Sequence, residues 1–244
     1  MNSFLRFTNQ EHVASVLRKP NLHALVRGVV RNQSFSRVLW RTPALRIISG
    51  EAHGRRLKAP RGLRTRPATA RARASIFSTI AARLDLEGVN ILDIFAGSGS
   101  LGIEALSRGA ASATFIDSSR EAAATIRENL ENLGLAERGT VISVDVFRAL
   151  AELGPANRRF GVVFIDAPWT NDMSAKVLED LARHGLVQQG GWVIVRQSRR
   201  AAEAPQAPTE YERFKLATLG DHRIAFYRRR EDGTGEDAGG SADE

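Results

Sequence analysis

The 244-residue sequence contains no cysteine, which excludes disulfide bonds, thiolate metal sites and cysteine nucleophiles. Its five histidines are scattered, with no pair at helical spacing, so we expect no zinc site or other metal centre. No apolar run approaches the roughly 18 to 20 residues that a membrane span needs, and no compact apolar stretch near the start resembles a signal-peptide core. We therefore expect an intracellular protein without a membrane segment.

Basic residues outnumber acidic ones by 35 to 27, and the excess is unevenly distributed. Between Arg46 and Arg73, nine lysines and arginines face a single acid, Glu51. Arginine dominates this cationic arm, and the planar guanidinium suits phosphates and stacks on bases. The arm therefore predicts contact with a nucleic acid, with an ordinary solvated surface as the simpler alternative.

Composition divides the chain into four regions. Residues 1–44 carry seven basic residues and one acid and form a basic extension that we expect to be poorly ordered. A hairpin and an arginine-rich helix are expected over 45–84, an α/β domain over 85–230, and a disordered acidic tail over 231–244. A cytoplasmic location is the first expectation, and an organelle is the alternative if residues 1–44 are a transit peptide.

Near-continuous apolar strands alternate with helices through the larger region. Strands are predicted at 89–95, 112–117, 140–145, 161–166 and 191–197, with helices over 101–107, 119–133, after 146 and over 173–184. Such alternation predicts a parallel sheet covered on both faces. The segments 211–220 and 222–230 have no helix between them, so we expect an antiparallel pair at one edge of the sheet.

The first strand runs into a glycine-rich turn, "DIFAGSGSLG", which contains Gly97, Gly99 and Gly102. Glycines at this turn let the backbone approach a ligand closely and leave helix N–H groups pointing at it. Asp117, twenty residues after Gly97, is suited to accept hydrogen bonds from ribose hydroxyls. This spacing is equally typical of a nicotinamide-binding domain, so an NAD-dependent oxidoreductase is one alternative.

Asp93, at the end of the first strand, favours a different ligand. A carboxylate here would repel the pyrophosphate of a dinucleotide, whereas it suits the cationic end of S-adenosylmethionine (SAM). Asp145, at the end of the third strand, is a candidate acceptor for the adenine amine, with Phe147 packing on the ring. An ordinary helix N-cap is the alternative for Asp145.

The fourth strand ends in "DAPW", from Asp166 to Trp169. The Asp166 carboxylate and the Ala167 carbonyl can both accept hydrogen bonds from one exocyclic amine, while Pro168 fixes the direction of the backbone. Trp169 offers a flat face on which a base can stack. These residues predict a clamp for a nucleobase amine, and the simpler alternative is a helix cap beside a core tryptophan.

Asp93 with "FAGSG", "DAPW" and the arginine-rich "GRRL…TRPATARARASIF" resemble the bacterial small-subunit ribosomal RNA guanine-N2 methyltransferase family over about residues 45–230. The resemblance implies a Rossmann-like, seven-stranded, mostly parallel sheet, SAM as cofactor, 16S ribosomal RNA or an assembling small subunit as partner, and a monomer. It also implies three groups of site residues. The catalytic group is Asp166, Ala167, Pro168 and Trp169; the cofactor group is Asp93, Phe95, Gly97, Gly99, Asp117, Asp145 and Phe147; the RNA-binding group is Arg55, Arg56, Arg66, Arg71 and Arg73.

The sequence departs from the family pattern at three positions. Ala167 replaces the first proline after the aspartate, and Ala70 and Ala74 replace two acids of the arginine-rich arm. One alternative is therefore an RNA-binding or assembly factor that keeps the fold and has lost activity. Another is an N6-adenine methyltransferase, because the same clamp handles either amine.

Overall fold

The computed structural model describes residues 45–60, 70–167, 173–199 and 204–231, all within the compact unit that begins at Ala44. The predicted N-terminal extension and the acidic tail after Glu231 lie outside these residues. So do three predicted site residues, Arg66, Pro168 and Trp169. No helix within the described ranges is long and apolar enough to cross a membrane.

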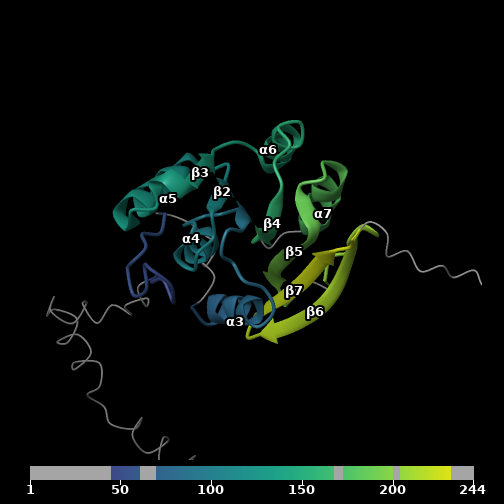
Figure 1. Ribbon diagram of the computed structural model, residues 1–244, viewed down its shortest axis with the longest axis horizontal. Coiled ribbons are helices and arrows are strands. Elements are labelled where there is room, and N and C mark those ends of the chain that lie inside the picture. Colours follow the sequence, from purple (N-terminus) through teal and green to yellow (C-terminus); the bar gives the residue numbers. More distant parts are fainter. Residues whose placement is uncertain (1–44, 61–69, 168–172, 200–203, 232–244) are drawn as a thin grey trace, which may run out of the picture. The chain divides into compact units, whose positions relative to one another are not determined.

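A seven-stranded sheet forms the centre of this unit, with the strand order β3-β2-β1-β4-β5-β7-β6 (Figure 1). Strands β1 to β5 are parallel to one another, whereas β7 runs antiparallel to both β5 and β6. The predicted fold, a mostly parallel sheet with an antiparallel edge, is confirmed. The strands are β1 (Asn90–Ile94), β2 (Ser112–Ile116), β3 (Gly139–Ile142), β4 (Phe160–Ile165), β5 (Val187–Ser198), β6 (Tyr211–Leu219) and β7 (His222–Arg229).

Helices cover both faces of the sheet and bury two separate apolar clusters. On β4, Val162 and Phe164 belong to one cluster while Val163 and Ile165 belong to the other, because successive strand residues point to opposite faces. The first cluster packs against α3 (Ala70–Ala81), α4 (Ser100–Ser107) and α5 (Arg120–Leu133). The second packs against α6 (Val146–Leu153) and α7 (Met173–Arg183). A short 3-10 turn, η2 (Ala136–Arg138), leads into β3.

Two segments differ from the sequence-based expectation. The predicted hairpin over residues 45–60 contains a single antiparallel bridge, between Arg46 and Arg56, rather than two strands. Strand β5 begins at Val187, four residues earlier than expected, and its pairing with β4 shifts register after Phe160. Gly190, with φ at +70°, lies in this irregular part. Because glycine is typical of turns, it led the sequence pattern to predict a later start for the strand.

The 45–58 segment is attached to α4 by polar contacts. The Glu104 side chain, which has no solvent exposure, accepts hydrogen bonds from the backbone N–H groups of Ile48 (2.7 Å) and Ser49 (3.0 Å). Ser107 Oγ accepts from the Ala52 N–H at 3.0 Å and donates to the Ser49 carbonyl at 2.7 Å. Backbone groups of this segment that would otherwise be buried without partners are thereby satisfied.

Candidate functional site at the carboxyl ends of the strands

The strand order reverses beside β1, because the chain passes from β1 to β2 and β3 on one side and then to β4 on the other. In open α/β sheets, ligands bind at the carboxyl ends of the strands next to such a reversal. Asp93 lies near the end of β1, Asp117 directly follows β2 and Asp166 directly follows β4. The Asp166 N–H donates to the carbonyl of Ile94 at 3.2 Å, so β4 and β1 are joined up to this edge. The structure therefore brings these three predicted carboxylates to one edge of the sheet.

The glycine-rich turn between β1 and α4 adopts a backbone that most residues avoid. Gly97 and Gly99 have φ values of 56° and 74°, and Phe95, which is not glycine, has a φ of 59°. Left-handed backbone at a residue such as Phe95 costs about 1–3 kcal/mol and is found mainly at functional sites. Gly99 is the N-cap of α4 and has no side chain to cap the helix, and within the first turn the Gly102 N–H donates to Asp93 Oδ2 at 2.9 Å.

Asp93 is a buried carboxylate with one oxygen unsatisfied. Its Oδ2 accepts a hydrogen bond from the Gly102 N–H at 2.9 Å, while Oδ1 has no partner among the described residues, and the residue is only 1% exposed. Burial raises the pKa of this carboxyl well above its ordinary value; the Gly102 N–H opposes the rise, and the charges of Asp166 and Asp117 add to it. A cationic ligand beside Oδ1 would supply the missing partner.

Asp117 shapes the turn from the end of the neighbouring strand. Its Oδ2 accepts from the Gly97 N–H at 2.8 Å and its Oδ1 accepts from the Ser119 N–H at 2.9 Å. Each carboxylate oxygen has a second acceptor direction, so these bonds fix the side chain without exhausting it. The predicted ribose contact stays a prediction.

Asp145 is the N-cap of α6. Its Oδ1 accepts from the backbone N–H groups of Phe147 at 2.9 Å and Arg148 at 3.4 Å. The alternative role, a helix N-cap, is therefore present in the structure. Phe147 is half-buried and packs against the second apolar cluster. The contacts of Asp145 and Phe147 with an adenine remain predictions.

Asp166 is held by a buried arginine that sequence reasoning missed. Arg196, on β5, donates from Nη2 to Asp166 Oδ2 at 2.6 Å, and their side chains are 5% and 18% exposed. Burial raises the pKa of Asp166, and the charge and hydrogen bond of Arg196, together with nearby His222, oppose the rise. Ala167 is buried beside it. A lone arginine in the apolar run "GWVIVRQ" was the available signal.

The predicted RNA-binding arginines separate into two environments. Arg55, Arg56 and Arg71 are exposed. Arg73 is fully buried and donates to the Arg46 carbonyl at 2.8 Å, so direct contact with RNA does not fit it. It shares the inward face of α3 with Ile76, because residues three apart lie on one side of a helix. Burial lowers the pKa of Arg73, while the charge of Glu104 opposes this change.

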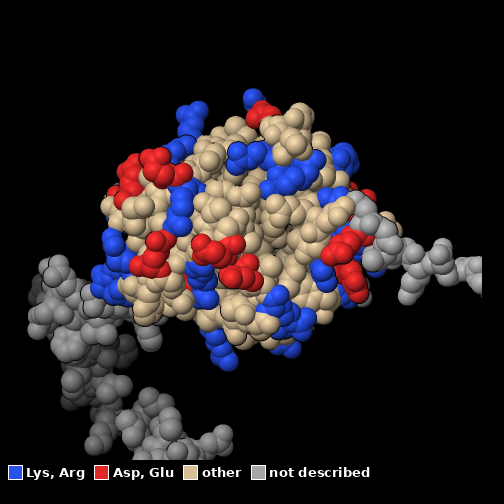
Figure 2. Space-filling view, in the orientation of Figure 1, with Lys and Arg blue, Asp and Glu red and all other residues tan. Residues whose placement is uncertain are grey.

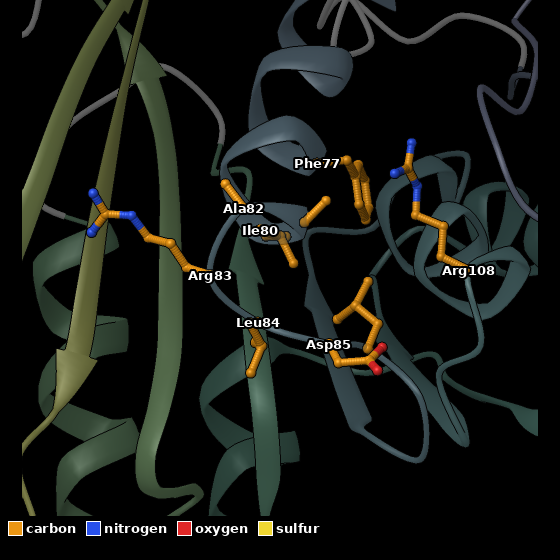
Figure 3. A pocket seen from close by; sticks show the side chains of 9 residues that line it. Phe77, Ile80, Ala82, Arg83, Leu84, Asp85 and Arg108 are labelled. Atoms are coloured by element: carbon orange, nitrogen blue, oxygen red, sulfur yellow. The ribbon is translucent and has the colours of Figure 1, made fainter.

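Charged side chains of both signs are interspersed on the face shown in Figure 2. A separate pocket of about 540 Å³ lies at the opposite, amino end of the sheet, between α3, the segment before β1 and the end of α4. Arg83 and Arg108 reach from opposite sides of it, around Phe77 and Ile80 (Figure 3). None of the predicted site residues lines this pocket, so we do not include it in the site.

Comparison with known proteins gives consistent matches across the described unit. The model of the family described as "Conserved hypothetical protein 95" matches residues 45–228. The chain is 34% identical over 186 residues to the "Putative rRNA methyltransferase YlbH" of Bacillus subtilis, covering 76% of this chain and all of that protein. It is 30% identical over 189 residues to the "Ribosomal RNA small subunit methyltransferase D" of Escherichia coli, covering 78% of this chain and 92% of that protein.

A solved structure gives the same result. The "Putative methyltransferase yhhF from Escherichia coli" superimposes with a TM-score of 0.68 at 31% identity, covering 76% of this chain and 98% of that one. The resemblance predicted from Asp93, "FAGSG" and "DAPW" is confirmed at the level of the family. This chain belongs to the Conserved hypothetical protein 95 family, alongside these ribosomal RNA methyltransferases.

Proposed function

We propose that this protein is a SAM-dependent methyltransferase that methylates the exocyclic N2 amine of a guanine in small-subunit ribosomal RNA. Family membership and relatives named as ribosomal RNA methyltransferases support the general activity. The observation that carries the proposal is that Asp93 and Asp166 both lie beside the glycine-rich turn, at the edge where the strand order reverses.

The residues of the turn fit the proposed cofactor. SAM supplies a methyl group on a positively charged sulfur and also carries an amino group. The unpartnered Oδ1 of Asp93 suits one of these cationic groups, and the turn that follows β1 has the left-handed backbone at Gly97 that glycine adopts readily. Asp117 is available for the ribose hydroxyls and Asp145 for the adenine amine. A dinucleotide pyrophosphate would face the Asp93 carboxylate, which disfavours the nicotinamide alternative.

Asp166 is the proposed acceptor for the target amine. A guanine amine is a poor nucleophile because its lone pair is delocalised into the ring. Hydrogen bonds to Asp166 Oδ1 and the Ala167 carbonyl would favour a pyramidal amine whose lone pair points at the methyl carbon. Bound SAM would supply the methyl group, with the electrons of its carbon–sulfur bond left on sulfur as the amine nitrogen bonds to carbon, and Asp166 would accept the proton that the nitrogen releases. Most of the catalysis would come from positioning and charge placement.

The choice of guanine in RNA is the finer part of the proposal. A paired base cannot reach a buried methyl donor, so the target must be unpaired or flipped out of its helix. Trp169 is the proposed stacking surface, and the exposed Arg55, Arg56 and Arg71 are the proposed phosphate contacts. A monomer in the cytoplasm that acts on small-subunit particles completes the proposal.

An assembly factor without catalytic activity is the second candidate, because Ala70, Ala74 and Ala167 depart from the family pattern. Two measurements on one preparation separate the candidates: SAM binding by calorimetry, and transfer of labelled methyl to undermethylated small subunits. We expect the wild type to show both. Asp166→Asn should bind SAM within about threefold of wild type and lose about 10- to 100-fold in transfer rate, because a neutral amide accepts more weakly.

Asp85→Asn, at the exposed amino end of the sheet, is the matched control and should be unchanged in both measurements. Salt-sensitive RNA binding without methyl transfer by the wild type would favour the assembly factor. Full activity of Asp166→Asn would remove Asp166 from the proposed clamp.

A further inference from the structure

The contacts of Arg196 extend the proposed function, on which this inference rests. Asp166 is the proposed acceptor for the target amine, and its backbone is fixed by the bond from its N–H to Ile94. A fixed backbone leaves the side chain free to rotate. A partner is therefore needed to orient the carboxylate and to keep it ionised. Arg196 is the described residue that binds it, at 2.6 Å.

The position of the Arg196 guanidinium is itself fixed. The side chain projects from β5, whose neighbours are β4 on one side and β7 on the other. Nη2 contacts Asp166 Oδ2, and Nη1 lies 3.2 Å from Nδ1 of His222, at the start of β7. Nε is buried without a partner in the described structure. The guanidinium therefore bridges the carboxyl end of β4 to the first residue of β7.

We propose that Arg196 is a positioning residue for methyl transfer: it binds one oxygen of Asp166, keeps the carboxylate ionised, and turns the other oxygen toward the target amine. The contact to Oδ2 leaves Oδ1 as the oxygen for the substrate. A guanidinium only donates hydrogen bonds, so it cannot compete with the carboxylate for the hydrogens of the amine.

The charge around Asp166 makes this partner necessary. Arg196 on β5 and His222 on β7 act on the charge of Asp166, and Asp166 in turn interacts with Asp93 on β1, which also feels the charge of Asp117 after β2. Burial favours a protonated Asp166, which would donate to the amine where the reaction needs an acceptor. Arg196 and His222 lower the pKa of Asp166 and so oppose this tendency.

Steady-state methyl transfer with wild type, Arg196→Met and Arg196→Lys tests the proposal. Arg196→Met should lower kcat by about 10- to 100-fold, as for a displaced reacting group, with SAM affinity by calorimetry within about threefold. Its pH–rate profile should also move, so that the rise in rate occurs at higher pH. Arg196→Lys keeps the charge and should restore part of kcat and the original profile. Arg228→Met, an exposed arginine at the amino end of the sheet, is the matched control.

The possible outcomes distinguish the positioning role of Arg196 from the proposed methyltransferase function. Equal kcat and the same pH profile in wild type and Arg196→Met would overturn the role of Arg196 while leaving the methyltransferase function intact. An equal loss in SAM binding and in kcat for Arg196→Met, with an unmoved pH–rate profile in that variant, would show that Arg196 only supports the fold. Absence of transfer by the wild type would overturn the proposed function and this inference with it. His222→Gln shows whether the histidine's own titration sets the profile, and under the proposal the Arg196→Met shift persists in that background.

Discussion

Asp93→Asn should affect the stability of the protein and its proposed SAM binding in opposite directions. In the unfolded chain an aspartate ionises near pH 4. In the folded protein, burial raises the pKa of Asp93 well above that value. Between the two values the folded state holds a proton that the unfolded state has lost, so the free energy of unfolding falls as pH rises. The slope for one proton is at most about 1.4 kcal/mol per pH unit.

In the asparagine variant residue 93 does not titrate, so this dependence of stability on pH is absent. The other titrating groups are common to both proteins. The melting temperature of Asp93→Asn should therefore rise relative to wild type by up to about 3–6 °C per pH unit above pH 4, for a unit of this size. The same variant should bind SAM about 10- to 150-fold more weakly, because a hydrogen bond to a charged group is lost. Melting curves of both proteins from pH 4 to 8 measure the first effect and calorimetry the second. Parallel melting temperatures across this range would contradict a raised pKa of Asp93 in the folded protein.

Three further substitutions test the structure around the site. Glu104→Gln should lower the free energy of unfolding by about 1–3 kcal/mol in urea denaturation, because a backbone N–H of Ile48 or Ser49 loses its acceptor. Unchanged stability would contradict the attachment of 45–58 to α4 through Glu104. Gly102→Ala should cost about 1–3 kcal/mol in the same assay, because its Cβ would lie 2.4 Å from Phe115 Cε1, and a neutral result would mean that the ring moves freely. Arg71→Ala should weaken RNA binding and lower its salt slope by about one, measured by fluorescence anisotropy at several salt concentrations; equal binding at every salt concentration would make Arg71 an ordinary surface residue.

The fold was predictable because its signals are local. Apolar strands and the glycine turn can be identified one segment at a time, and the carboxyl ends of parallel strands share one edge. The strand pattern alone therefore predicts that Asp93 and Asp166 lie at this edge. Asp145 was harder, since the same residue suits a helix N-cap and a ligand contact, and the structure contains the cap.

Of the three missed features, Arg196 and Glu104 depend on long-range packing, whereas Arg73 depends on the periodicity of its own helix. Arg73 lies in a run of arginines that predicts an exposed surface, but the periodicity of α3 turns it inward. Arg196 is 30 residues from Asp166 in the sequence, and the two meet only because β4 and β5 are neighbours. Glu104 lies within a helix pattern, and its role depends on the 45–58 segment packing against that helix. Composition and residue spacing do not predict which distant backbone N–H groups need an acceptor.

Methyl transfer to N2 of a guanine in small-subunit ribosomal RNA can be tested by identifying the product itself. The most direct measurement is incubation of undermethylated small subunits with the purified protein and SAM, followed by digestion of the RNA to nucleosides and identification of the methylated nucleoside by mass spectrometry. We expect N2-methylguanosine, in amounts that depend on Asp166. A methyl group on any other atom, or RNA that stays unmethylated although the protein binds SAM, would contradict the proposed function.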